Sequence, residues 1–141
     1  KSTVQASTTT ESLSFNHPCK ELIWGVVPQS ASPLNFAPHS TSKAQLKLNG
    51  HERFAERSGD YFELVQPWQH HTNIPVDKGI NVYSFSLKPE EHSPSGTCNM
   101  SRIDNAQLNL TSTTSGSLYV FATNYNVLRV MSGMGGLAFS N

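Results

Sequence analysis

The chain has 141 residues, with ten Lys or Arg against ten Asp or Glu, so its formal charge is zero when histidine is neutral. Only 14% of the residues are charged, and this composition excludes the basic surface that binds nucleic acid or an anionic membrane. The length suits one domain. A surface poor in charge tolerates close contact with other copies, so the composition favours assembly.

Hydropathy and cysteine content exclude two further classes. No apolar run approaches the roughly 18 residues that a transmembrane helix needs. The two cysteines, Cys19 and Cys98, are too few for a disulfide framework, and no CxxC pair suggests a thiolate zinc site. We therefore predict two reduced, buried thiols, no transmembrane segment and no cofactor.

The first half of the chain predicts one long strand between loops. Residues 1–16 are rich in Ser and Thr and nearly free of large apolar groups, so they predict a loop or a frayed start. Residues 21–27 are apolar on both alternating faces, which is typical of a strand between two layers. Residues 28–42 turn to Pro, Ser, Asn and His and predict a long loop.

The middle of the chain is less regular. Residues 44–48 alternate as a strand and end at Asn49-Gly50, a dipeptide typical of tight turns. Residues 51–72 have no period of two. We expect irregular structure there, with one helical turn near residues 60–65 that stops at Pro67.

The second half returns to strand patterns. Further strands are predicted at residues 79–88, 105–111, 118–131 and 137–139. Thr123-Asn124 breaks the third of these, and the glycines of residues 133–136 separate it from the last. Short strands joined by loops of Pro, Gly, Ser and Asn, with almost no helix, predict an all-β protein. The loops are long for hairpins, which favours a jelly-roll sandwich.

The run PEEHSPSGTCNMSRID, residues 89–104, is the strongest candidate for chemistry. A cysteine nucleophile needs a base within hydrogen-bond reach, and His92 lies six residues before Cys98. Nothing in the run requires that contact, and the adjacent Glu90 and Glu91 point apart in an extended chain. We therefore assign no catalytic residue and interpret the run as a structural loop whose hydroxyls bond backbone amides. That loop comprises Pro94, Ser95, Gly96, Thr97, Cys98 and Asn99.

Six histidines raise a cupin-like alternative, in which a jelly roll holds a metal ion. Chelation from one strand needs ligands two residues apart, but the chain has no HxH, and consecutive His70 and His71 face opposite sides of a strand. We therefore assign no metal ligand. Asn99 and Asn109 satisfy the glycosylation sequon, although we interpret Asn99 as a turn residue and Asn109 as the outward side of a strand.

Two long runs carry a specific resemblance. GINVYSFSLKPEEHSPSGTCNMSRIDNAQLNL, residues 79–110, and ATNYNVLRVMSGMGGLAFSN, residues 122–141, closely resemble the C-terminal end of the major capsid proteins of nucleocytoplasmic large DNA viruses. HPCKELIW, residues 17–24, and LNGHERFAERSGDYFELVQPWQHHT, residues 48–72, look like preceding segments of the same family. The resemblance covers most of the chain from residue 17 onward.

The resemblance implies a structural role without catalysis. Members of the family consist of two consecutive jelly rolls, so residues 17–141 are expected to be the C-terminal part of the second one. We expect about half of a jelly roll, with an uncovered core face that depends on the rest of a longer polypeptide. The interior is expected to contain Leu22, Trp24, Val26, Tyr83, Phe85, Leu87, Leu108, Leu110, Val120 and Leu128.

The same resemblance implies the partners. Three copies form a trimeric, pseudo-hexagonal capsomer, and capsomers tile an icosahedral shell. The expected partners are therefore further copies of the chain and minor capsid proteins, with no direct contact to nucleic acid. The expected location is the capsid shell of a virion, after synthesis in the host cell cytoplasm.

Two other functions stay open at this point. A small β-sandwich that binds glycans is favoured if Tyr61, Trp68 and Tyr125 form an exposed concave cluster. A cupin-like metalloenzyme needs at least two histidines that converge within metal distance.

Overall fold

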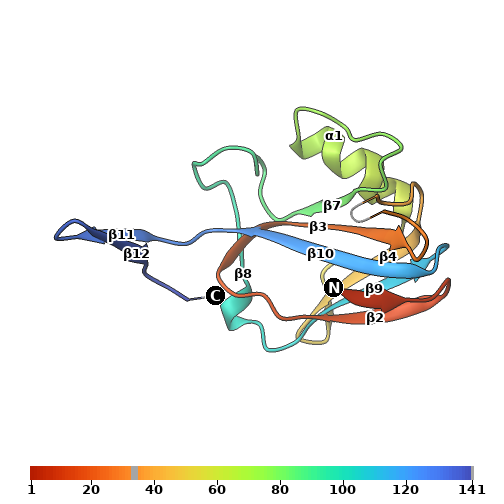
Figure 1. Ribbon diagram of the computed structural model, residues 1–141, viewed down its shortest axis with the longest axis horizontal. Helices are drawn as coiled ribbons and strands as arrows, with labels where there is room; N and C mark the ends of the chain where they lie inside the picture. Colours follow the sequence, from red (N-terminus) through yellow and green to blue (C-terminus); the bar gives the residue numbers. More distant parts are fainter. Residues whose placement is uncertain (33–34, 141) are drawn as a thin grey trace.

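The structure, a computed structural model, describes residues 1–32 and 35–140. Two antiparallel sheets stack face to face, and a two-stranded hairpin projects from one end of the sandwich (Figure 1). The first sheet has the order β1 (Ser2–Val4), β10 (Gly116–Asn124), β3 (Pro18–Pro28), β7 (Asn81–Ser84), with β8 (Cys98–Asn99) also paired to β3. The second has the order β2 (Thr8–Leu13), β9 (Ala106–Ser112), β4 (Thr41–Leu48), β5 (His51–Glu52), with β6 (Arg57–Ser58) also paired to β4.

The connections make this sandwich a jelly roll. The chain passes from β1 in one sheet to β2 in the other, then to β3 and to β4 in alternate sheets. The short β5 and β6 stay in the sheet of β4, β7 and β8 belong to the first sheet, and β9 and β10 alternate again. Each sheet has a path of four strands, which is the eight-strand double sheet of a jelly roll. The all-β jelly-roll prediction is confirmed. The expectation of only half a jelly roll is wrong, because both sheets are present and cover one another's inner face.

The expectation of a loop or frayed start at residues 1–16 is also wrong. β1 pairs with β10, and β2 pairs with β9 from Thr8 opposite Thr111 to Leu13 opposite Ala106. The polar composition hid these strands, although threonine is β-branched and suits an extended backbone. Long-range pairing with strands about a hundred residues away decides the conformation here.

Apolar alternation explains the core. Along β9 the burial alternates strictly, and β3 is buried on both faces because a loop and the helical turns cover its outer side. Trp24 of β3 packs against Phe62, with ring centroids 5.2 Å apart. Of the expected interior residues, six are buried: Leu22, Trp24, Val26, Tyr83, Leu108 and Leu110. Phe85 and Val120 are partly buried against the same core.

Leu87 was expected in the interior but is 73% exposed. β7 ends at Ser84, whose hydroxyl donates to the Ser86 carbonyl at 2.6 Å and accepts the Ser86 N–H at 3.2 Å. This local turn ends the alternation that began at Tyr83. The strand predicted over residues 79–88 is therefore shorter than its pattern suggested.

Leu128 was also expected in the interior and is 70% exposed. The register of β10 shifts between Thr123 and Asn124, after which the chain leaves the sandwich. β11 (Leu128–Met131) and β12 (Met134–Leu137) then form a separate hairpin. The strand expected at residues 137–139 lies earlier, because Ser132 and Gly133, both with positive φ, form the turn.

The segment between β6 and β7 is helical for longer than expected. A π-helical turn, η1 (Tyr61–Val65), leads directly into α1 (Gln66–His70). Pro67 does not stop it, because proline is tolerated in the first turn of a helix, where its missing N–H has no partner to lose. The third short helix, η2 (Met100–Arg102), is a 3-10 turn after β8. The turn predicted at Asn49-Gly50 is confirmed, since both residues have positive φ and join β4 to β5.

Candidate functional site

The loop singled out for chemistry is an ordered connection. The Leu87 N–H donates to the Ser95 carbonyl at 3.3 Å, and the Lys88 N–H donates to the Ser95 hydroxyl at 2.9 Å. The Ser86 hydroxyl donates to the Gly96 carbonyl. Gly96 has a φ of 132°, and an added Cβ would lie 2.8 Å from the Phe85 carbonyl oxygen. These contacts give the loop one shape and support its interpretation as structural.

His92 and Cys98 take part in different contacts. The carbonyl of His92 accepts the Tyr125 hydroxyl at 3.3 Å, while Cys98 lies directly opposite Cys19 in the β3–β8 pair. Both thiols are free. Burial raises the pKa of Cys98, and burial together with the neighbouring Cys98 raises the pKa of Cys19 to about 12. A nucleophilic cysteine needs the opposite change.

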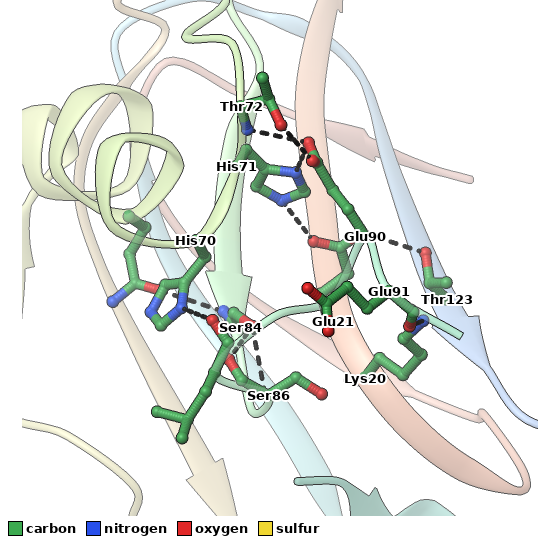
Figure 2. A network of polar contacts seen from close by, with 12 residues as sticks. Lys20, Glu21, His70, His71, Thr72, Ser84, Ser86, Glu90, Glu91 and Thr123 are labelled. Atoms are coloured by element: carbon green, nitrogen blue, oxygen red, sulfur yellow. Dashed lines mark hydrogen bonds and ion pairs between the residues drawn. The ribbon is translucent and has the colours of Figure 1, made fainter. Parts of the chain in front are cut away.

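The most connected polar group lies beside this loop and is centred on His71 (Figure 2). Its Nε2 is 2.7 Å from Oε2 of Glu21 on β3, and its Nδ1 is 3.1 Å from Oε1 of Glu90 in the loop. A carboxylate can only accept, so the imidazolium form, in which both nitrogens donate, satisfies both contacts at once. The Glu21 side chain is buried, and its other oxygen lies 3.4 Å from the Thr123 hydroxyl.

Glu90 is held by several donors although it is exposed. The Thr72 hydroxyl donates to it at 2.6 Å and the Thr72 N–H at 3.0 Å, in addition to the His71 contact. These hydrogen bonds, the hydroxyl first, lower the pKa of Glu90 to about 2. Next to it, Nζ of Lys20 donates to the Glu91 carbonyl at 2.9 Å. The network therefore ties the end of α1, the loop and β3 together.

A second histidine lies between two carboxylates on the other side of the helical segment. Nδ1 of His39 is 3.3 Å from Oε2 of Glu63, and its Nε2 is 3.2 Å from Oδ1 of Asp77. Glu63 belongs to η1 and is buried, whereas Asp77 is exposed. Residues 61–78 are thus attached to the rest of the fold by two acid–histidine–acid groups, through Glu63 and Asp77 near their ends and through His71 between them. Their role is attachment, because each histidine bridges two carboxylates of the fold, although the buried Oε1 of Glu63 has no hydrogen-bond partner in the described part of the chain.

The structure supports neither the cupin-like metalloenzyme nor the glycan-binding β-sandwich that the sequence left open. The described residues contain no group of three or more His, Cys, Asp or Glu side chains suited to hold a metal ion. Tyr61 accepts the Gln66 amide at 2.7 Å and lies under Arg57, while Tyr125 lies 5.1 Å from Nζ of Lys20. Trp68 is exposed on α1. The three aromatic rings therefore have separate surroundings.

The two sequon asparagines have internal partners. Oδ1 of Asn99 accepts the Ser101 N–H at 3.2 Å and begins η2, which is a turn role. Nδ2 of Asn109, on β9, donates to Oε1 of Gln45 at 3.3 Å. Pattern reasoning found both residues but did not find the Glu21–His71–Glu90 group. Its members lie 50 and 19 positions apart, and no local pattern signals such a contact.

Comparisons with known proteins agree on one family. Residues 1–136 match the family described as large eukaryotic DNA virus major capsid protein. The chain is 55% identical to the major capsid protein of Pyramimonas orientalis virus, over 92% of this chain and 38% of that protein. The chain therefore spans well under half the length of that relative.

Solved structures agree with the sequence relatives. VP54 of PBCV-1, fitted into a reconstruction of the virophage Sputnik, matches with a TM-score of 0.82 and 31% identity, over 96% of this chain and 48% of that one. A quasi-atomic model of the PBCV-1 capsid contains a chain that matches with a TM-score of 0.79 and 33% identity, over 96% and 46% of the two chains. Among the described residues of this chain, no helix is long and apolar enough to cross a bilayer.

Proposed function

Because the chain belongs to the family of major capsid proteins of large eukaryotic DNA viruses, we propose that it is a building segment of a virion shell. The observation that carries the proposal is the family match along residues 1–136, together with a jelly roll that superposes on a chain of a viral capsid. The relatives are named for a structural role. This supports function through contacts between subunits, without turnover of a substrate.

The physical character of the chain supports assembly. Its formal charge is zero with few charged residues, so copies meet little electrostatic repulsion. Its long loops are attached by the groups at His71 and His39, which gives surface segments a defined shape for contact. Shells gain strength from many weak and identical contacts, so single interfaces need not be tight.

More specifically, three copies of the protein form a pseudo-hexagonal capsomer, and capsomers tile an icosahedral shell. Further copies of the chain and minor capsid proteins are its partners, and the capsid shell is its location after synthesis in the host cell cytoplasm. Within a longer polypeptide, residues 17–141 with the two strands before them form the C-terminal jelly roll. The lengths of the Pyramimonas orientalis virus protein and of VP54, of which this chain covers 38% and 48%, leave room for a second one.

The solution mass and the outline of the purified protein test this function. For the full-length protein, three copies of which would carry six jelly rolls, we expect particles whose mass is a multiple of three subunits and whose outline in electron micrographs is hexagonal. A protein that remains monomeric at every concentration, or that consumes a substrate, contradicts the proposal. Mass photometry and negative-stain imaging are sufficient.

A further inference from the structure

Residues 127–139, which we call the arm, project from one end of the sandwich (Figure 1). The arm contains β11, β12 and their flanks. Half of the large hydrophobic side chains exposed in the described residues belong to it. They are Val127, Leu128, Val130, Met131, Met134, Leu137 and Phe139.

The arm is a sheet without protection at its edges. β11 pairs only with β12 in the described part of the chain, so each strand has one free edge. Proteins usually blunt such edges with lysine, proline or a bulge, but residues 127–139 contain no lysine or proline, and Arg129 is their one charged residue. A two-stranded hairpin alone is marginally stable in water. The composition therefore suits a hairpin that is covered by something else.

Its own sandwich covers only the base of the arm. The Tyr125 N–H donates to the Pro18 carbonyl at 2.9 Å, and the rings of His17 and Phe139 lie 6.5 Å apart. Beyond that point β11 and β12 contact chiefly each other. The cross-strand pairs Leu128 with Leu137 and Val130 with Gly135 share one face, which is free of charge.

A second apolar surface lies on the flank of the sandwich away from the arm, on the helical segment and the loop that follows it (Figure 1). Five more of the exposed hydrophobic side chains gather there: Leu64, Val65, Trp68, Ile74 and Val76. Beside them is a cavity of about 250 Å³ lined by Ile23, Ile74, Ile80 and Val82, among others. We call this surface the helical patch. Among the large hydrophobics exposed in residues 1–32 and 35–140, only Leu87 and Phe121 lie outside these two surfaces.

We propose that the arm of one copy packs on the helical patch of a second copy, head to tail. This inference rests on the proposed function, since it requires that copies of the chain assemble. Two different surfaces make a heterologous contact, which closes into a ring when the rotation between subunits allows it. A trimer is such a ring. The one charge on the arm argues against nucleic acid or an anionic membrane as the occupant.

The size of the arm agrees with a contact between subunits. Seven apolar side chains, all more than half exposed, present on the order of several hundred Å², the size at which apolar patches mark interaction sites. A standard interface buries roughly 800 Å² on each partner. The arm is therefore one part of a larger contact, whose remainder comes from the flanks of the sandwich.

Sedimentation equilibrium of the whole 141-residue chain tests the inference. Val130→Glu on the arm and Trp68→Glu on the helical patch are each expected to weaken self-association at least about tenfold, because a charge would be buried in an apolar contact. Leu87→Glu is the matched control, since it adds the same charge at an exposed apolar side chain outside both surfaces. It should change association less than about twofold. Val130→Glu combined with Val76→Lys should recover part of the loss.

The possible outcomes distinguish a failure of the arm inference from a failure of the proposed capsid function. Unchanged assembly of Val130→Glu, or a monomeric wild-type chain, overturns the arm inference and leaves the proposed function standing, whereas a full-length protein that stays monomeric overturns both. Binding of the wild type to phosphatidylcholine vesicles, lost in Val130→Glu without a change in self-association, also overturns the arm inference and makes lipid the occupant. Urea unfolding midpoints equal to wild type establish that the variants fold. Met134→Glu is a second arm variant with the same expectation.

Discussion

The sandwich and the arm are built from the same kind of strand and differ in what covers them. Leu22 on β3 and Leu128 on β11 both lie in apolar strand segments, yet the first is 1% exposed and the second 70%. Both regions use a two-residue turn with positive φ, at Asn49-Gly50 and at Ser132-Gly133. In the sandwich a second sheet buries the apolar face, whereas the arm has no second sheet of its own. Strand periodicity therefore identifies an apolar face without saying which molecule buries it.

The largest expected effect separates the two leucines. Leu22→Ala is expected to lower the free energy of unfolding by about 2–5 kcal/mol, because it removes buried methyl groups and leaves a cavity. Leu128→Ala should change it by no more than about 0.5 kcal/mol, since the side chain is mostly in water. Urea unfolding of the dilute chain, followed by tryptophan fluorescence, measures both. Similar losses for the two variants would mean that the arm is part of the folding unit.

A smaller effect is expected at the loops that are attached to the sandwich. His71→Ala removes the donor to the buried Glu21 carboxylate and should destabilise the chain by about 1–3 kcal/mol, the cost of an unsatisfied buried group. His92→Ala is the control, because this exposed residue contributes its carbonyl to the fold. It should stay within about 0.5 kcal/mol. Equal unfolding midpoints at pH 6 for His71→Ala and the wild type would contradict an anchoring role for His71.

Glycines in two similar turns allow a matched comparison, in which the expected losses of unfolding free energy differ by about 1 kcal/mol. Gly50 and Gly133 have φ of 80° and 76°, and an added Cβ would meet nothing within 4 Å at either position. Gly50→Ala should cost about 1 kcal/mol of unfolding free energy, from backbone strain alone. Gly133→Ala should leave the unfolding of the sandwich unchanged, because its turn lies in the arm. A loss at both positions would show that the two regions unfold together.

The smallest effect is a local dependence on pH. Hydrogen bonds lower the pKa of Glu90 from 4.5 to about 2, so the ionised carboxylate stabilises the loop above pH 4.5, and this contribution is lost as the pH falls towards 2. Exchange of the Thr72 amide hydrogen, which Glu90 accepts at 3.0 Å, reports it directly. Protection corrected for intrinsic exchange should fall between pH 4.5 and 2. Glu90→Gln should reduce this fall, and an unchanged profile would contradict the assignment.

The sequence predicted the all-β fold class correctly, but it did not predict the strands β1 and β2 or the point at which β7 ends. β9 was recognisable because both its pattern and its burial follow a period of two, and β3 was recognisable because its short run is apolar, and buried, on both faces. β1 and β2 were missed, since short Ser- and Thr-rich segments become strands only through their pairing with β10 and β9. Leu87 was misplaced because the hydroxyl of Ser84 turns the chain, and hydrogen bonds of that kind leave no trace in periodicity.

The polar contacts of the candidate site were harder to predict from the sequence than the strands were. The loop of residues 94–99 was interpreted as structural from its turn residues, and its hydrogen bonds to Lys88 and Ser101 fit that role. The group at His71 could not be anticipated, because β3, the end of α1 and the loop meet only in the folded chain. Long-range polar contacts depend on the packing of whole elements, which a single sequence does not encode locally.

Hydrogen–deuterium exchange on dilute and assembled protein tests the central claim, that the sandwich is complete by itself while the arm needs a second copy. We expect the amides of β3, β9 and β10 to exchange slowly in both samples. Those of β11 and β12 should exchange quickly in dilute protein and slowly after assembly. Equal exchange of the arm in the two samples, whether fast or slow, would contradict the account.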